Sequence, residues 1–208
     1  LEASVLACER HPTDAMERAI GAYAAARGVS PANLDARWTL VRDYDFDSVG
    51  KHMSHVWHAL DDDGYMVAAK GALEGILAHS RLDESARSAA VEANSRLAAQ
   101  GLRVLALAGK RMDQLGADRD ADERDLTLYG LLGFQDPLRP EVPAAVAECQ
   151  HAGIRITMIT GDHALTAHAV AEAAGILHED DLIATADELT ALDQAIGVLH
   201  LIDRLFVL

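Results

Sequence analysis

The chain has 208 residues, half of them hydrophobic and a quarter charged, which is the balance of a globular protein with one large or two small cores. Its formal net charge of −15 argues against non-specific binding to nucleic acid or to an anionic membrane. No run approaches the roughly 20 apolar residues that span a bilayer, and Cys8 and Cys149 are too few and too far apart in sequence to suggest a disulfide framework.

The first 125 residues predict short helices followed by a strand-rich region. Asp14 has the chemistry of a helix N-cap, and Glu17 stands where a capping box would place it. The acidic turn at 61–64 favours a hairpin between the strands on either side. Strands are expected over residues 38–46, 52–60, 65–69 and 102–108, and helices over 14–28, 72–79 and 83–100.

Residues 110–125 are dominated by charged side chains. A run of this kind is usually a solvated loop or a connection between domains, and we assign it no function. The change in composition after it predicts a domain boundary near residues 125–130.

The remaining chain has an α/β pattern. Residues 126–134 are expected to form a strand, and a helix begins at Pro140 and ends at Gly153. The run at 154–159 is short and rich in β-branched residues, which is typical of a parallel strand covered on both faces. A second helix follows and stops at Gly175.

The turn at residues 160–162 lies between this predicted strand and the second helix. Ligands of open α/β sheets bind outside the carboxyl ends of strands, and a helix N-terminus there favours anions. A phosphate site is therefore one interpretation of the turn. The other is that Asp162 only caps the helix, and spacing alone does not separate the two.

Two motifs in this half, D-P-L-R at 136–139 and T-G-D at 160–162, closely resemble those of P-type cation-transporting ATPases, of the calcium-pump-like kind. The resemblance implies that residues 126–208 are part of a Rossmann-like phosphorylation domain of the haloacid-dehalogenase type. The residues that it places at the phosphate site are Asp136, Thr160, Gly161 and Asp162.

The stretch from Phe46 to Ser54 resembles the family's F-S-x-x-R-K-x-M-S strand. The resemblance implies that the ring of Phe46 stacks on adenine and that Lys51 lies in the same pocket. Gly50 replaces the arginine that is usual there. By residue chemistry alone, a core phenylalanine, a core methionine and a solvent-facing lysine are the favoured explanation of the stretch.

Three further positions resemble nucleotide contacts of the family. Lys70 and Gly71, in K-G-A-L-E, match its K-G-A-P-E motif, in which the lysine lies deep in the adenine pocket; glycine lets a ligand approach closely. Arg103 matches an arginine that meets the phosphates, and Asp14 an acidic residue beside adenine. Without the resemblance these would be an exposed lysine, a strand-edge charge and a helix cap.

The resemblance implies an α/β protein with a nucleotide-binding domain over residues 1–125, an antiparallel sheet flanked by helices, and a partial phosphorylation domain over 126–208. It also implies ATP as ligand, Mg²⁺ in the full-length enzyme, and actuator and transmembrane domains of the same polypeptide as partners, at the cytoplasmic face of a membrane. The sequence has neither D-K-T-G-T, the site of the phosphorylated aspartate, nor G-D-G-x-N-D. We therefore expect a soluble fragment that binds ATP weakly without turning it over.

Two other functions fit part of the sequence. A free-standing haloacid-dehalogenase-like phosphatase would share the 160–162 turn but needs a D-x-D nucleophile motif near the N-terminus, where none occurs. A non-enzymatic interaction module would leave Lys70 and Arg103 as surface charges. A metal site at His52, His55 and His58 is not expected, because this spacing on a strand alternates faces.

Overall fold

The computed structural model describes residues 1–135, 137–160, 164–176, 182–184 and 205–207. It divides into two compact units. The first comprises Leu1–Asn94 with Val104–Leu132, and the second Ser95–Arg103 with Gly133–Leu208. None of the helices in the described ranges is long and apolar enough to cross a bilayer.

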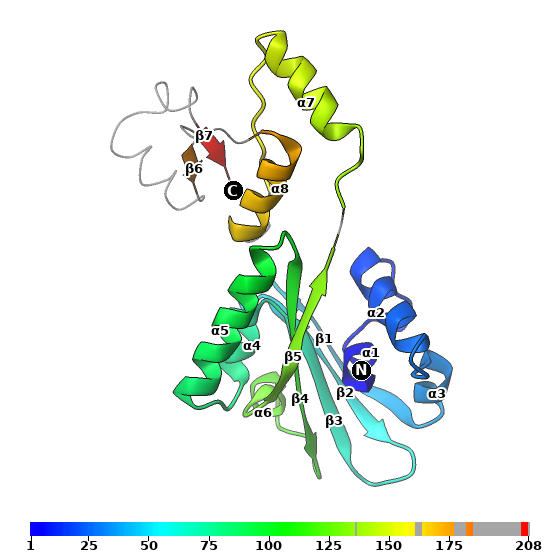
Figure 1. The fold of residues 1–208 in the computed structure, drawn as a ribbon. Helices are drawn as coiled ribbons and strands as arrows, with labels where there is room; N and C mark the ends of the chain where they lie inside the picture. Colours follow the sequence, from blue (N-terminus) through cyan, green and yellow to red (C-terminus); the bar gives the residue numbers. More distant parts are fainter. Residues whose placement is uncertain (136, 161–163, 177–181, 185–204, 208) are drawn as a thin grey trace. The chain divides into compact units, whose positions relative to one another are not determined.

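The first unit is built on a five-stranded sheet in the order β1-β2-β3-β4-β5, which follows the order of the chain (Figure 1). β1 to β4 pair antiparallel with their neighbours. This confirms the predicted fold class, an α/β protein with an antiparallel sheet flanked by helices. The strands are β1 Trp38–Asp47, β2 His52–Ala59, β3 Tyr65–Gly71, β4 Arg103–Met112 and β5 Thr127–Phe134.

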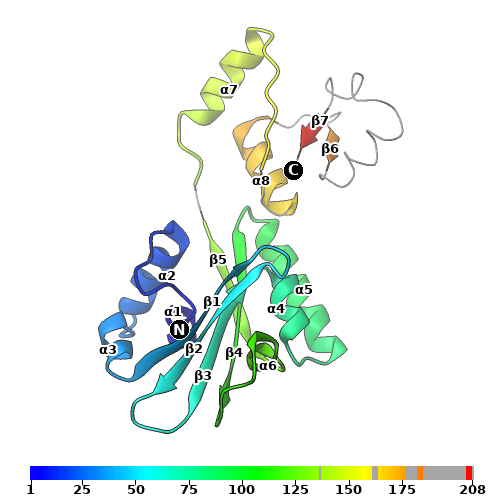
Figure 2. The same cartoon turned by 180° about the vertical axis from the view of Figure 1, so that it is seen from behind.

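Helices cover both faces of this sheet, as the two opposite views show (Figures 1 and 2). α1, α2 and α3 lie on one face, and α4, α5 and α6 lie on the other. The helices are α1 Glu2–Leu6, α2 Ala15–Ala25, α3 Pro31–Asp35, α4 Leu73–His79, α5 Glu84–Ala98 and α6 Arg119–Glu123.

The sheet separates two hydrophobic cores because successive side chains of a strand point to opposite faces. On β3, Val67 and Ala69 join a core with Ile76 of α4, whereas Ala68 joins a second core with Leu6 of α1. All five of these side chains are almost completely buried. Burial on both faces makes the sheet a rigid support for the loops at its ends.

The charged run at 110–125 is not the solvated loop that we predicted. Part of it forms α6, which begins at the cap Asp118. Asp122 and Glu123 of this helix are 0% and 1% exposed. Their partners on β1 and β2, described below, lie more than sixty residues earlier in the chain, so the run by itself does not show this burial.

The second unit contains α7 Val142–His151, α8 Ala164–Ala174 and two short parallel strands, β6 Leu182–Ala184 and β7 Leu205–Val207. The predicted helix ends are confirmed, since Gly153 and Gly175 follow the two helices with φ of +77° and +74°. The predicted strand at 154–159 is wrong. Only Ile159 makes a β-bridge, and it is 76% exposed. An apolar pattern indicates only that the side chains favour burial, whereas a buried strand also needs a hydrogen-bonded backbone partner on each side.

Candidate functional site

A pocket of about 330 Å³ opens beside the ends of β1 and β3. It gathers Asp14, Phe46, Lys70 and Gly71, which the family resemblance assigns to nucleotide. The lining is completed by Met16, Glu17, Met53 and Leu105. The walls therefore combine apolar side chains with one lysine and two carboxylates.

Phe46 contributes an aromatic ring to the pocket that is largely exposed to solvent. Its side chain is 62% exposed, although large apolar side chains are normally covered. The register of β1 against β2 shifts between Tyr44 and Asp47, so Phe46 lies in an irregular part of the ladder. Such irregularities re-aim side chains at the ends of sheets. The ring is thus held on the strand while one side of it stays open to a ligand.

Lys70 lies at the base of the pocket and is only 6% exposed. It stands opposite Met53 in the β2–β3 ladder. Its ammonium group donates to the Ala7 carbonyl, to Glu17 Oε1 at 2.6 Å and to Met53 Sδ at 3.0 Å. The burial of the charge is thereby offset by a carboxylate and a carbonyl, while its third contact is to a thioether, a weak acceptor.

Asp14 caps α2 as predicted, because its Oδ1 accepts from the backbone N–H groups of Met16 at 2.8 Å and Glu17 at 3.2 Å. The predicted capping box is wrong. The Glu17 side chain turns away from the helix start, pairs with Lys70 and accepts from the N–H of Glu9 at 3.3 Å. A buried ammonium group is a stronger partner for a carboxylate than a helix-end N–H.

Gly71 is required by the neighbouring strand. A Cβ at this position would lie 2.4 Å from the carbonyl oxygen of Lys51 and 2.6 Å from Cα of His52. No real side chain tolerates such distances to backbone atoms. The glycine therefore lets β3 run close to the start of β2, whatever else it does for a ligand.

Lys51, Arg103 and the residues of the predicted phosphate site are not gathered with the others. Lys51 has a φ of 53° and forms an exposed ion pair with Glu74 at 2.9 Å; it does not line the pocket. Arg103 is exposed at the start of β4. Of the predicted phosphate site, Thr160 is described as irregular backbone, whereas the other three residues lie outside the described residues: Asp136, Gly161 and Asp162.

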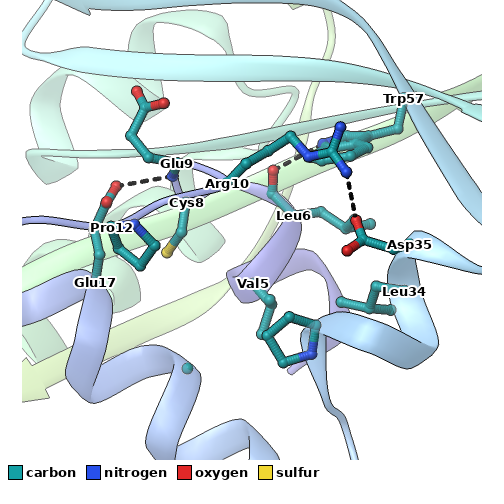
Figure 3. Close-up of a pocket in the computed structure, with 12 residues that line it drawn as sticks. Val5, Leu6, Cys8, Glu9, Arg10, Pro12, Glu17, Leu34, Asp35 and Trp57 are labelled. Carbon is teal, nitrogen blue, oxygen red and sulfur yellow. Dashed lines mark hydrogen bonds and ion pairs between the residues drawn. The ribbon is translucent and has the colours of Figure 1, made fainter.

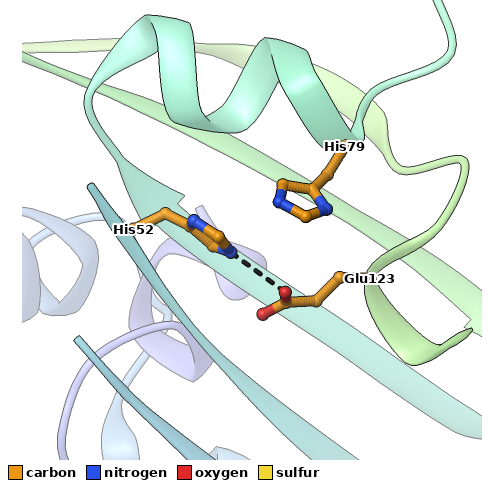
Figure 4. Close-up of side chains that lie close together, drawn as sticks. All are labelled: His52, His79 and Glu123. Atoms are coloured by element: carbon orange, nitrogen blue, oxygen red, sulfur yellow. Dashed lines mark hydrogen bonds and ion pairs between the residues drawn. The ribbon is translucent and has the colours of Figure 1, made fainter. Parts of the chain in front are cut away.

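Sequence reasoning missed a buried polar cluster centred on Glu123 of α6. Its carboxylate accepts from Ser54 Oγ at 2.6 Å and from Arg119 Nε at 2.9 Å, and it contacts His52 Nε2 at 3.0 Å. The ring of His79 lies near that of His52, with 4.6 Å between centroids (Figure 4). The only signal in the sequence was a pair of carboxylates on a short helix, which also suits a solvated surface.

The cluster favours the charged forms of His52 and Glu123. The hydrogen bond to Glu123 raises the pKa of His52 above 6.5, against the effect of burial. Burial opposes the ionisation of Glu123, but hydrogen bonds from His52 and Ser54 outweigh it and lower the pKa of Glu123 below 4.5. His52, Ser54 and Glu123 are thus paired with one another, and Arg119 already supplies a cation. We interpret the cluster as structural.

Asp122 forms a second buried ion pair on the same helix. Its Oδ2 accepts from Arg42 at 2.7 Å and from the Tyr44 hydroxyl at 2.9 Å, and its Oδ1 accepts from the Gly116 N–H at 2.7 Å. α6 is therefore fastened to β1 by Asp122 and to β2 by Glu123. These contacts hold the two strands whose ends carry Phe46 and Lys51.

A smaller pocket of about 80 Å³ lies among α1, α2, α3 and β2 (Figure 3). Arg10 pairs with Asp35 at 3.0 Å at one side, and the indole N–H of Trp57 donates to the Leu6 carbonyl at 2.8 Å. Burial raises the pKa of the Cys8 thiol to about 12, so this cysteine is inert as a nucleophile. The Arg10 guanidinium and the Trp57 indole N–H thus have partners in this wall.

Comparison with known proteins supplies the family of this site. Residues 11–141 match the family described as P-type ATPase, cytoplasmic domain N. The sodium/potassium exporting P-type ATPase cta3 of Schizosaccharomyces pombe is 43% identical over 150 residues, 67% of this chain and 14% of that protein. A calcium-transporting ATPase of Bacillus subtilis is 32% identical over 206 residues, 93% of this chain and 23% of that protein. Plasma membrane calcium-transporting ATPase 1 of Homo sapiens is 36% identical over 156 residues, 67% of this chain and 13% of that protein. The chain thus spans less than a quarter of each.

Proposed function

The chain belongs to the P-type cation ATPases, as a piece of their cytoplasmic part that carries the N domain, and we propose that it binds the adenosine end of ATP beside Phe46. The observation that carries the proposal is the open ring of Phe46 above an apolar pocket with a buried lysine at its base. Clefts of a few hundred Å³ with apolar walls and a few placed polar groups are typical small-molecule sites.

Each polar group at the pocket suits one edge of a purine. The weak contact between Lys70 and Met53 Sδ can be exchanged for a ring nitrogen, which is a better acceptor. The cap made by Asp14 uses Oδ1, so its other oxygen can accept from an exocyclic amine. Phe46 supplies the face on which the base stacks.

The phosphates contribute little to affinity in this proposal. Among the lining residues Lys70 is the single cation, and Glu17 pairs with it, while the pocket also contains Asp14. Net charge at the pocket is therefore negative, which opposes a triphosphate. We expect AMP and ATP to bind with affinities within about tenfold of each other, and both to bind weakly.

For the whole protein we propose ATP-driven cation transport, which is the activity that its relatives' names describe. The family resemblance adds that ATP phosphorylates an aspartate in this reaction. The actuator and transmembrane domains would belong to the same polypeptide, and this part would lie at the cytoplasmic face of the membrane. The sequence has no D-K-T-G-T or G-D-G-x-N-D motif, so we assign no residue of this chain to Mg²⁺ binding. We expect the chain by itself to bind nucleotide without hydrolysing it.

Isothermal titration calorimetry of the chain with ATP, AMP and tripolyphosphate tests the adenosine proposal. ATP and AMP should bind and tripolyphosphate should not. Phe46→Ala should weaken ATP binding by about 5- to 150-fold, since stacking of a base on an aromatic ring contributes about 1–3 kcal/mol.

The matched control is Tyr23→Ala, which removes a ring 52% exposed on α2 that does not line the pocket. It should bind ATP as the parent does. If Phe46→Ala bound ATP as tightly as the parent, or if tripolyphosphate bound while AMP did not, the adenosine pocket would be refuted.

A further inference from the structure

His55 of β2 is a buried histidine with one ring nitrogen that has no hydrogen-bond partner. Its side chain is 1% exposed, and Nδ1 lies 3.0 Å from the Leu6 carbonyl oxygen. A carbonyl can only accept, so Nδ1 carries the hydrogen and Nε2 presents a lone pair when the ring is neutral. Within the part of the chain that the structure describes, Nε2 is the one buried side-chain nitrogen or oxygen without a hydrogen-bond partner.

Two carboxylates face this nitrogen. Asp43 Oδ1 lies 3.2 Å from Nε2, without the geometry of a hydrogen bond, and Glu9 Oε1 lies 4.0 Å from it. A lone pair and two anions at these distances repel one another, so the group favours a positive charge between them: a proton on Nε2, which then pairs with Asp43, or a metal ion. A buried polar atom left without a partner costs about 1–3 kcal/mol.

The three side chains are positioned by separate parts of the fold. Asp43 of β1 is the direct cross-strand partner of His55, so the backbone ladder holds these two together. Glu9 follows α1, and its carboxylate points away from Glu17 (Figure 3). The Leu6 carbonyl that orients His55 also accepts from Trp57, which holds the end of α1 on the sheet.

We propose that His55, Asp43 and Glu9 bind one divalent transition-metal ion of the Zn²⁺ type. One imidazole and two carboxylates are a suitable donor set for such ions. Bonds of about 2.1 Å in tetrahedral geometry place neighbouring ligand atoms about 3.4 Å apart. The 3.2 Å between Nε2 and Asp43 Oδ1 is close to this value.

Glu9 completes the set by a side-chain rotation. The three candidate ligand atoms lie within 4.8 Å of one another, and the side chains of Glu9 and Asp43 are 45% and 43% exposed. Glu9 can therefore close the remaining gap, and an ion can enter from solvent. The hydrogen bond from Nδ1 to a backbone carbonyl is the arrangement that orients metal-binding histidines.

A second group of possible ligands consists of His52, His79 and Glu123, and there the histidine nitrogen beside the carboxylate already has partners. His52 Nε2 already contacts Glu123, and a nitrogen of Arg119 lies 3.3 Å from the same atom. A metal ion there would displace made interactions and approach a guanidinium cation. The His55 site loses no hydrogen bond when an ion binds.

The test uses the whole 208-residue chain, with no tag histidines and after treatment with a chelator. Zn²⁺ is titrated in competition with a chromophoric chelator, and Co²⁺ absorption reports the ligand set. We expect one tight Zn²⁺ per chain and a rise in melting temperature with Zn²⁺. Asp43→Asn and Glu9→Gln, both at partly exposed positions, should each weaken Zn²⁺ binding at least tenfold while leaving the melting temperature without metal nearly unchanged.

Two controls separate this site from other histidines. His58→Gln, on the same strand, and His79→Gln, in the other cluster, should leave Zn²⁺ affinity unchanged. The proposal is overturned if the parent binds no Zn²⁺ beyond what the Asp43→Asn chain binds, or if His79→Gln removes the ion. Nucleotide is absent from these titrations, so their outcome does not depend on the adenosine pocket.

Discussion

Glu123→Gln removes a buried negative charge while keeping the size and shape of the side chain. In the parent, the carboxylate bonds to Ser54 and Arg119 and contacts His52, and it is 1% exposed. The substitution leaves Arg119 and a protonated His52 without their anion. The amide can accept from only one oxygen, so at least one of the three contacts is lost.

Removing one partner of a buried ion pair typically costs about 3–5 kcal/mol. Arg119 is partly exposed, with 27% of its side chain accessible, so water recovers part of its loss and we expect the lower end of that range. The first unit has roughly 120 residues, for which 1 kcal/mol corresponds to about 4 °C. The melting temperature of this unit should therefore fall by about 10–15 °C.

Urea unfolding followed by Trp38 and Trp57 fluorescence measures the effect, because both indoles are buried in the first unit. The matched control is Asp120→Asn, an exposed acid on the same helix, which should change the unfolding free energy by less than about 0.5 kcal/mol. If Glu123→Gln lay within 1 kcal/mol of the parent, the ion cluster would not stabilise the fold as we infer.

Three further outcomes are expected. Because the pKa of His52 is raised and that of Glu123 is lowered, the contribution of this pair to stability should be fully present between pH 4.5 and 6.5. It should be lost as pH rises through the folded pKa of His52, or as pH falls through the folded pKa of Glu123. Unfolding free energies measured across pH should show this maximum in the parent and a flatter profile in Glu123→Gln. Gly71→Ala should destabilise the chain by several kcal/mol, since the added Cβ would overlap the opposing backbone. Gly21→Ala, whose Cβ would have no atom within 4 Å, should stabilise α2 by about 0.5–1 kcal/mol in the same denaturation assay. Equal effects of the two substitutions would contradict the close approach at Gly71. Lys70→Met should lower stability by about 3–5 kcal/mol by leaving a buried carboxylate unpaired, and a melting temperature equal to that of the parent would refute the ion pair.

Local sequence signals predicted most elements of the first unit. The alternation of residues from 38 to 69 and the acidic turn at 61–64 placed three strands within two residues of the observed limits. Asp14 marked the start of α2, and Gly153 and Gly175 marked the ends of α7 and α8. These signals work because caps, turns and strand alternation depend on residues that are adjacent or a few positions apart.

The candidate site was predicted less completely. The residues that line the pocket include Phe46 and Lys70 as expected, but Lys51 forms an ion pair with Glu74 outside it. The apolar run at 154–159 predicted a strand, and the structure shows irregular backbone there. The partner of Lys51 lies 23 residues away in the sequence, and a buried strand needs pairing partners from other segments, so the local pattern specifies neither outcome.

By itself the sequence indicated the family and most of the helices and strands of the first unit. Only the tertiary structure decided where the charges lie. In the folded chain Glu17 pairs with Lys70, and Glu123 is buried against His52. Asp43 and Glu9 lie beside the nitrogen of His55 that has no hydrogen-bond partner. The reason is that the free energy of a charge depends on its surroundings in space, and the partners here lie far from one another in sequence.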